Sequence, residues 1–173
     1  MTTIFSSVQK VFLYTMLLLI GLYAGMLFFH EMAPIETQLN PIEYAKYWKI
    51  VDGTFMHERM GIMGPGMLIL FIITIVLFIK DWKSLTFLFL VLSIIAFFLD
   101  IRLTVTQQLP INAFINELDL KNITELQTKQ LTAYQAIAIS NCETRFVHGI
   151  ISFVLLCLTP FFLPRLNKKI NKN

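Results

Sequence analysis

Histidine, arginine and acidic residues stand beside four apolar segments of this chain, and they gather at corresponding ends of those segments. A charged group in hydrocarbon is costly unless it faces a partner, so ionisable residues in membrane segments usually mark a binding or catalytic site. Carboxylates and imidazoles can accept protons there, and a guanidinium can stabilise an anionic oxygen. The residues are His30 and Glu31, His57 to Arg59, Asp100 and Arg102, and Arg145 with His148.

Arg145 has the strongest need for a partner, because its guanidinium is always charged. At about 1.5 Å per residue, Asp100 and His148 both lie about 24 Å into the membrane, so their helices can bring these residues together. Asp100 and Arg145 are then either an ion pair that joins two helices or part of a catalytic site. In the catalytic interpretation Arg145 or His148 binds a phenolate or quinol oxygen, and a carboxylate or imidazole accepts its proton. We expect the catalytic residues to be His148, Arg145, Asp100 and Glu58.

Three histidines on three different segments could ligate one transition metal, copper or iron, through neutral imidazoles. The three are His30, His57 and His148, with Glu31 or Glu58 as an oxygen ligand or second hydrogen-bond partner. His30 and His57 lie several ångström higher than His148 by helical rise, so the site requires helix tilt or a kink at Gly64-Pro65-Gly66. In the alternative interpretation His30 and His57 are ordinary interfacial residues, and His148 bonds a carbonyl or Asp100. A haem held by His30 and His148 ranks behind the metal ion, and Met60, Met63 and Met67 could line a cavity beside the histidines.

The elements that position these residues follow from composition. Of 173 residues, 56% are hydrophobic and 14% are charged, which excludes an ordinary soluble domain. Each apolar run is close to the roughly 20 residues that cross a hydrocarbon core. We predict spans at residues 11–30, 58–79, 84–105 and 134–163. The fold class is then all-α: a single transmembrane domain over residues 1–173, an integral membrane four-helix bundle with two part-helical outer loops.

Basic residues set the expected orientation, because they favour the cytoplasmic side of a membrane. One side of the four spans holds Lys10, Lys80, Lys83, Arg165, Lys168, Lys169 and Lys172. Both termini are therefore predicted to be cytoplasmic, and the polar residues to face outward. With no eukaryotic secretory signal, we expect the inner (plasma) membrane of a bacterium. The mild positive charge arises largely from this bias and gives no reason to invoke nucleic acid.

The outer connections carry helix signals of their own. Pro41 with residues 43–48 predicts a short amphipathic helix. After Pro110 the segment 111–114 is expected to begin as a loop. Residues 122–125, Asn-Ile-Thr-Glu, fit an N-cap with a reciprocal glutamate, from which one helix runs unbroken into the membrane.

Small and polar residues at spacings of three and four predict the inward faces of two spans. On the fourth span they are Tyr134, Ala138, Asn141, Arg145, His148 and Ser152, and on the third Ser93, Ala96, Asp100, Thr104 and Gln107. The opposite face of the fourth span, expected to meet lipid, is Phe146, Val147, Ile150, Ile151 and Val154. Gly21 and Gly25 have GxxxG spacing for packing. Cys142 and Cys157 lie on one predicted helix and cannot bridge each other.

Short motifs spread along the chain carry a family resemblance. They are Gly21-Leu-Tyr-Ala-Gly25, Met32-Ala-Pro34, Tyr44 to Asp52 leading to Arg59-Met60, Gln107-Gln108-Leu-Pro-Ile-Asn112, and Arg145 ahead of Ile151-Ser-Phe153. With these motifs the chain resembles the anthrone oxygenase-like family of small four-helix membrane proteins, most of whose members have no assigned function.

The resemblance implies that Arg145 and Pro110-Ile111-Asn112 are typical family positions. It also implies an oxygen-dependent oxidation of a polycyclic phenol or anthrone to a quinone, through a stabilised carbanion or with a metal. The chain departs from the family immediately before Arg145. The family often has tryptophan and histidine there, whereas this chain has Asn141 and Cys142, with His148 one turn later.

The expected function is therefore a membrane-embedded oxidoreductase or oxygenase, with metal assistance left open. Its substrate would be apolar and aromatic, resembling an anthrone, phenol or quinol, and would bind at an outward-facing polar site. The alternative is a non-catalytic binding or transport module for a metal ion, haem, quinone or lipid. A proton-coupled exporter ranks last, because Asp100 lies well off the membrane centre. Expected partners are membrane lipid and a hydrophobic small molecule, not nucleic acid, and a homo-oligomer is left open.

Overall fold

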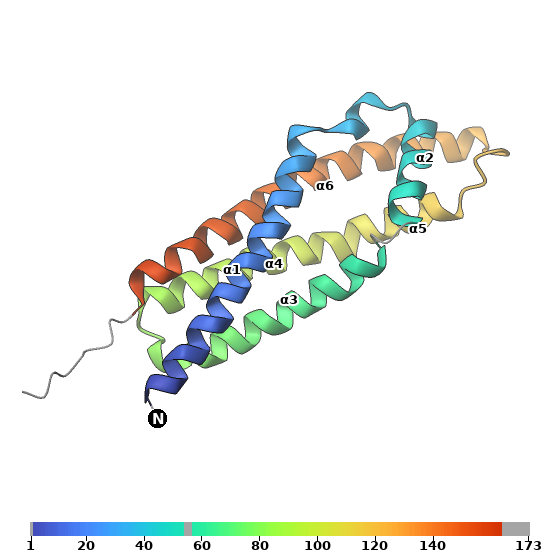
Figure 1. Ribbon diagram of the computed structural model, residues 1–173. Helices are drawn as coiled ribbons and strands as arrows, with labels where there is room; N and C mark the ends of the chain where they lie inside the picture. Colours follow the sequence, from blue (N-terminus) through green and yellow to red (C-terminus); the bar gives the residue numbers. More distant parts are fainter. Residues whose placement is uncertain (1, 54–56, 164–173) are drawn as a thin grey trace, which may run out of the picture.

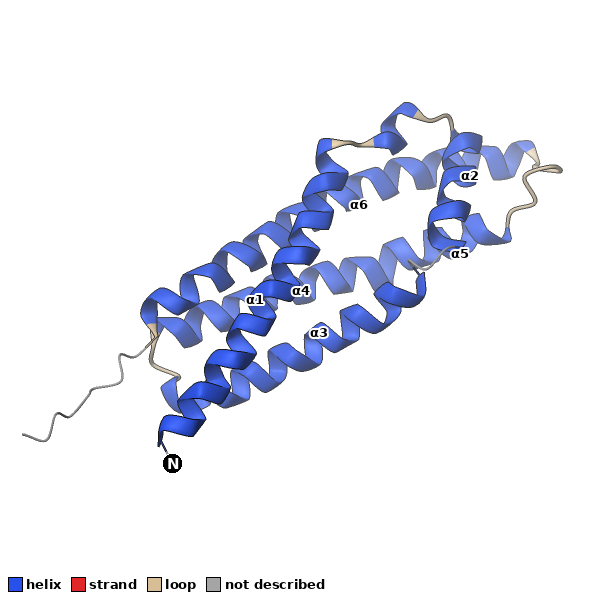
Figure 2. Ribbon diagram, viewed as in Figure 1, coloured by secondary structure: helices blue, strands red, loops and turns tan. Residues whose placement is uncertain are grey.

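The computed structural model describes residues 2–53 and 57–163, and within them every regular element is helical, with no strand (Figure 2). Four helices are long and apolar enough to cross a membrane, as the sequence predicts. They are α1 (Thr2–Met32), α3 (His57–Phe78), α4 (Leu85–Leu103) and α6 (Glu125–Leu158). The all-α bundle is therefore confirmed in the described part of the chain.

The four long helices form an elongated bundle with a short helical layer at one end (Figure 1). The beginning of α1, the end of α6 and the connection η3 (Ile79–Asp81) share one end. At the other end lie η1 (Ile35–Gln38), α2 (Pro41–Val51) and α5 (Leu109–Glu117). Because α6 has 34 residues, it is about 51 Å long and extends past the end of α1. The predicted unbroken fourth helix is present, followed by η5 (Thr159–Phe162).

The helix α2 begins as its sequence predicts. The Asn40 side chain accepts a hydrogen bond from the Glu43 backbone N–H at 3.0 Å, and Glu43 accepts one from the Asn40 backbone N–H at 3.1 Å. This reciprocal pair satisfies two backbone donors that a helix end leaves without partners. Pro41 occupies the first turn, where its missing N–H costs nothing.

The cap of α6 differs from the prediction by two residues. Thr124, not Asn122, is the N-cap, and its reciprocal partner is Gln127 rather than a glutamate. Glu125 lies in the first turn and pairs with Lys129 at 2.7 Å. Asn122 instead donates to Asp119 at 2.7 Å, and this bond lowers the pKa of the exposed Asp119 carboxyl.

A π-helical turn, η4 (Thr104–Gln108), joins α4 to α5 without a break. The predicted loop after Pro110 is absent, because Pro110 stands in the first turn of α5, where proline is tolerated. The wider turn also changes which side chains face inward: Gln108 is buried, whereas Gln107 is exposed. The prediction that Gln107 faces inward is therefore wrong, and the buried residue is its neighbour Gln108.

Serine side chains join α4 to α6. Ser93 Oγ donates to the Ser152 carbonyl at 2.8 Å, and Ser152 Oγ donates to the Ser93 carbonyl at 3.0 Å. Further along the same two segments, Thr86 donates to the Thr159 carbonyl at 3.3 Å. Ser93 and Ser152 belong to the predicted inward stripes and are both fully buried.

The helix α1 packs against α6 through glycine, but not as GxxxG spacing predicts. A Cβ at Gly21 would lie 3.1 Å from the Phe153 ring, whereas one at Gly25 would meet no atom within 4 Å. The closest approach is at Gly149 of α6, where a Cβ would lie 2.6 Å from a Leu27 methyl. On the other face of α6 the expected lipid-facing residues Val147, Ile151 and Val154 are exposed, but Phe146 packs against the core.

Candidate functional site

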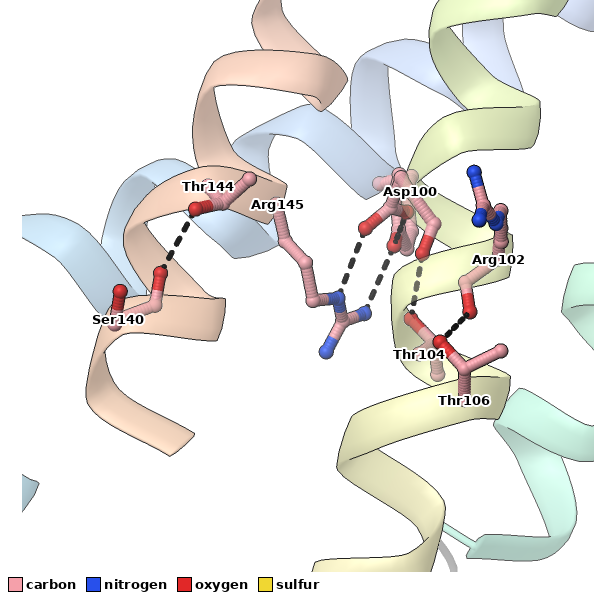
Figure 3. Close-up of polar contacts among 8 residues, drawn as sticks. Asp100, Arg102, Thr104, Thr106, Ser140, Thr144 and Arg145 are labelled. Atoms are coloured by element: carbon pink, nitrogen blue, oxygen red, sulfur yellow. Dashed lines mark hydrogen bonds and ion pairs between the residues drawn. The ribbon is translucent and has the colours of Figure 1, made fainter. Parts of the chain in front are cut away.

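A tyrosine, an aspartate and an arginine from three helices form a closed polar group inside the bundle. Arg145 Nε of α6 donates to Asp100 Oδ1 of α4 at 2.9 Å, and Arg145 Nη2 donates to the Tyr23 hydroxyl of α1 at 2.9 Å. The Tyr23 hydroxyl donates in turn to Asp100 Oδ2. Figure 3 shows Arg145 reaching across from α6 to Asp100. The partner that the sequence predicts for Arg145 is thus the observed one.

The Asp100 side chain is 0% exposed and has no contact with solvent. The Arg145 side chain is 16% exposed. Each carboxylate oxygen accepts a hydrogen bond, so burial leaves neither of them unsatisfied. Removing either charge would leave the other isolated in an apolar bundle. The geometry therefore fixes the direction in which the guanidinium points.

The remaining guanidinium nitrogen of Arg145, Nη1, makes no hydrogen bond with a described residue and points away from Asp100 (Figure 3). Arg145 and Tyr23 both line a cavity of about 400 Å³ between the helices. Its walls are mainly apolar and include Met60, Met63, Met67, Phe97 and Ile101. The three methionines named by the sequence thus line a cavity. Arg145 therefore contributes a cationic hydrogen-bond donor to a mainly apolar lining.

A second polar group lies in the wall of this interhelix cavity, at the α5 end. Gln108, Asn112, Asp52 and Trp48 all contribute to the lining there. Gln108 Nε2 donates to Asn112 Oδ1 at 3.0 Å, and Asn116 donates to Asp52 at 2.6 Å. Gln108 Oε1 is buried and has no hydrogen-bond partner among the described residues. The cavity is therefore apolar along its length and polar at two separate places.

Other ionisable residues that the sequence groups together do not join Asp100 and Arg145. Glu58 and Arg102 are exposed, and neither lines the interhelix cavity. His148 is half-buried, and its Nδ1 has no hydrogen-bond partner among the described residues. His148 also lies outside the lining of the interhelix cavity, so its expected contact with Asp100 is replaced by those of Arg145 and Tyr23.

His30 takes part in a different polar group, beside the short helices η1 and α2. Its Nε2 lies 3.3 Å from Glu36 Oε1 of η1, and Glu36 is almost completely buried. Both line a cavity of about 100 Å³ together with Tyr44, Trp48 and Cys142. His30 thus lies in the same cavity wall as Cys142, whereas His148 follows Cys142 by six residues on α6 and is not part of that wall.

No cluster of three or more His, Cys, Asp or Glu side chains that could hold a metal ion occurs among the described residues. The His57 side chain lies outside those residues, so the three-histidine site stays a prediction. Of the two described members, His30 lines the cavity of about 100 Å³, whereas His148 lines neither that cavity nor the interhelix cavity. A haem held by His30 and His148 stays a prediction as well.

Tyr44, in the short helix α2, is fully buried. Burial raises the pKa of its hydroxyl well above the ordinary value, and the nearby Cys142 and Glu36 act in the same direction. Tyr44 is therefore neutral at physiological pH. Its hydroxyl has no hydrogen-bond partner in the described part of the chain. The cavity of about 100 Å³ that Tyr44 lines with His30 and Glu36 therefore contains an unused polar group.

Two site residues carry roles that the sequence does not assign. Tyr23 stands on the inward face of the first span, but an isolated tyrosine there is indistinguishable from an ordinary packing residue. Gln108 follows Gln107 directly, and only the π-helical turn selects between them. No protein-family model matches the chain, and comparison with curated proteins and with solved structures found no match.

Proposed function

We propose that this protein binds an apolar aromatic molecule carrying a phenol-, quinol- or anthrone-type oxygen in the interhelix cavity, and that it oxidises this molecule with molecular oxygen. The observation that carries the proposal is a cavity of about 400 Å³ lined by methionine and phenylalanine, with Arg145 in its wall and one guanidinium nitrogen of Arg145 not engaged by Asp100 or Tyr23. The volume is that of a site for a small organic molecule. The reaction itself comes from the family resemblance.

The cavity walls favour a planar ring. Methionine thioethers are flexible and make favourable contacts with ring edges, so Met60, Met63 and Met67 can adapt to an aromatic surface. Phe97 adds a further aromatic surface, and its ring lies edge-on to that of Tyr23 with centroids 5.6 Å apart. An apolar ring placed here would have its polar substituent directed to Tyr23 and Arg145.

Arg145 stabilises the substrate oxygen as it becomes anionic, because its guanidinium is a fixed cationic donor in a low-dielectric site. Tyr23 then accepts the O–H proton of the phenol, or of the enol form of the anthrone, while passing its own proton to Asp100 Oδ2 along the existing hydrogen bond. Asp100 is the final acceptor in this scheme and does not touch the substrate. Its two hydrogen bonds hold Tyr23 and Arg145 in position.

The overall change balances with oxygen as the only co-reactant. One methylene carbon of the anthrone loses two hydrogens and gains a carbonyl oxygen. Dioxygen supplies that oxygen atom, accepts the electrons of the two broken carbon–hydrogen bonds, and releases its second atom as water. No step is assigned to a metal ion.

The same proposal includes the location. Four helices are long and apolar enough to cross a membrane, and we propose that they span the bacterial inner membrane, with both termini cytoplasmic and α2 and α5 on the outer side. The positions of Lys10, Lys80 and Lys83 support this orientation. Membrane lipid then surrounds the exposed apolar faces, and the substrate enters from the outer leaflet. The orientation is tested by fusing to the C-terminus a reporter enzyme that works only in the periplasm. Activity of that fusion would contradict the proposed orientation.

The reaction is tested with the purified protein in mild detergent, using a hydroxylated anthrone in air-saturated buffer. We expect quinone absorbance to rise with one dioxygen consumed per product. Tyr23→Phe removes only the hydroxyl that transfers the proton and should lower the rate by about 100-fold or more while leaving binding measurable. Tyr14→Phe, on an exposed position of the same helix, is the matched control.

Three other outcomes are informative. Binding without oxygen uptake would reject the oxygenase and leave the non-catalytic binding or transport module. Loss of turnover in His148→Ala, with Tyr23→Phe active, would transfer the role of proton acceptor from Asp100 to the imidazole. Absence of any binding would reject both functions.

A further inference from the structure

A buried amide oxygen in the interhelix cavity has no use in the reaction described above. Gln108 is 3% exposed, lines the cavity, and directs its Nε2 to Asn112 Oδ1 at 3.0 Å. That bond fixes the orientation of the amide and leaves Oε1 without a hydrogen-bond partner among the described residues. A buried acceptor without a donor costs free energy comparable to a lost hydrogen bond. A ligand that carries a donor would remove this cost.

The position of Gln108 relative to Arg145 defines the size of such a ligand. Arg145 is held at the level of Asp100, and Gln108 lies eight residues further along α4 and η4. At about 1.5 Å per residue these two backbone positions are up to about 12 Å apart along the bundle, since the π-helical turn rises less per residue. The wall between them includes Ile101, Val105 and Met63 and is mainly apolar, with Thr104 as a polar side chain. A single phenol ring is too short to reach both positions.

The charges around Gln108 favour a neutral donor. Asp52, in the same part of the lining, accepts a hydrogen bond from Asn116 at 2.6 Å. The neighbouring side chains Asn112, Thr104 and Trp48 are uncharged. An anionic substituent would therefore meet the Asp52 carboxylate, whereas a hydroxyl can donate to Gln108 Oε1 without bringing a charge into the cavity.

We infer that Gln108 is a specificity-determining residue that accepts a hydrogen bond from a second hydroxyl of the substrate, so that the preferred substrate class is a fused polycyclic phenol with hydroxyls at opposite ends. One oxygen binds at Arg145 and Tyr23, and the other binds at Gln108. This inference rests on the proposed function, because it assumes an aromatic ligand in the same cavity. It adds the length of the ligand and the chemistry of its far end.

The test uses two probes: a dihydroxyanthraquinone whose two hydroxyls stand at opposite ends of the fused rings, and its monohydroxy analogue. The chain has two tryptophans, and Trp48 lines the cavity whereas Trp82 lies in the α3–α4 connection. In a Trp82→Phe background, quenching of Trp48 fluorescence therefore reports binding. We expect the dihydroxy probe to bind about tenfold more tightly than the monohydroxy probe.

The Gln108→Met variant, with a side chain of similar length, should abolish this preference by weakening binding of the dihydroxy probe alone. Gln107→Met is the matched control, because its side chain is exposed, and it should retain the tenfold preference. A second measurement needs no variant: methylating the far hydroxyl of the probe should lower its affinity in the unmodified cavity to that of the monohydroxy probe.

The possible results are distinct. Equal affinities for the two probes in the unmodified cavity, or a preference that survives Gln108→Met, would overturn the inference and leave the proposed function intact. Failure of both probes to quench Trp48 would reject the proposed binding function itself. If Gln108→Met does not fold, the methylated probe decides the question.

Discussion

The two sides of the bundle are packed in opposite ways. On the closed side α1, α4 and α6 approach one another through glycine, paired serines and the Asp100–Arg145 ion pair. On the open side the outer half of α3 presents Met60, Met63 and Gly61 to a cavity of about 400 Å³. Polar side chains are therefore fixed on one wall, whereas flexible thioethers form much of the other.

This difference suits the membrane binding site proposed above. Helices in lipid gain little from burying apolar surface, so close packing and interhelical hydrogen bonds hold the closed side together. The open side can then leave space without separating the bundle. A rigid wall positions Arg145 and Tyr23, and an adaptable wall accepts rings of varied shape.

Asp100→Asn tests the closed side at its centre and should have the largest effect. It leaves the buried Arg145 guanidinium without a counter-charge, so we expect unfolding in detergent micelles to require about 3–5 kcal/mol less free energy. Glu117→Gln, at an exposed position of α5, should change little. A loss below about 1 kcal/mol for Asp100→Asn would mean that the ion pair does not hold the closed side together.

A pair of truncations compares the two sides directly. Leu156 of α6 is 0% exposed, so Leu156→Ala should lower the free energy of unfolding by about 2–5 kcal/mol. Met63 is half-buried and already borders empty space, so Met63→Ala should cost about 1 kcal/mol or less. Denaturant titration of both variants measures the difference. Equal losses would show that the open side is packed as firmly as the closed side.

The closed side is also the part that the sequence predicts best. Counting residues along two regular helices puts Asp100 level with His148 and within reach of Arg145, because each residue of an α-helix adds a nearly constant rise. Ser93 and Ser152 follow from the same periodicity. These predictions hold because α4 is regular up to Leu103 and α6 is regular throughout its length.

The open side and the outer layer are harder to predict, because single turns decide them. Because of one π-helical turn, Gln108 is buried in place of Gln107. The sequence of two adjacent glutamines gives no sign of that turn. His30 pairs with Glu36 because η1 brings the chain back beside α1, and the sequence gives no signal for that contact. On the closed side Tyr23 is an exception, because it differs from a packing residue only once α1, α4 and α6 meet.

Ser152→Ala tests the hydrogen bonds of the closed side with a smaller expected effect. It removes the bond to the Ser93 carbonyl while Ser93 can still donate to the Ser152 carbonyl. Interhelical hydrogen bonds in membranes contribute on average about 0.6 kcal/mol, so we expect a loss of that order in the free energy of unfolding. Ser140→Ala, exposed on the same helix, serves as the control. An equal change in both variants would remove the serine pair from the account of this interface.

Adding one methyl group to each side gives the smallest and most specific comparison. At Gly149 the new Cβ would lie 2.6 Å from a Leu27 methyl, so Gly149→Ala forces that side chain to move. At Gly61 nothing lies within 4 Å, and Gly61→Ala gains up to about 1 kcal/mol of helix propensity without a clash. We therefore expect Gly61→Ala to be neutral or stabilising and Gly149→Ala to be the less stable of the two by thermal unfolding. The reverse order would mean that the helices separate at Gly149 as readily as at the cavity, and that close packing does not distinguish the two sides.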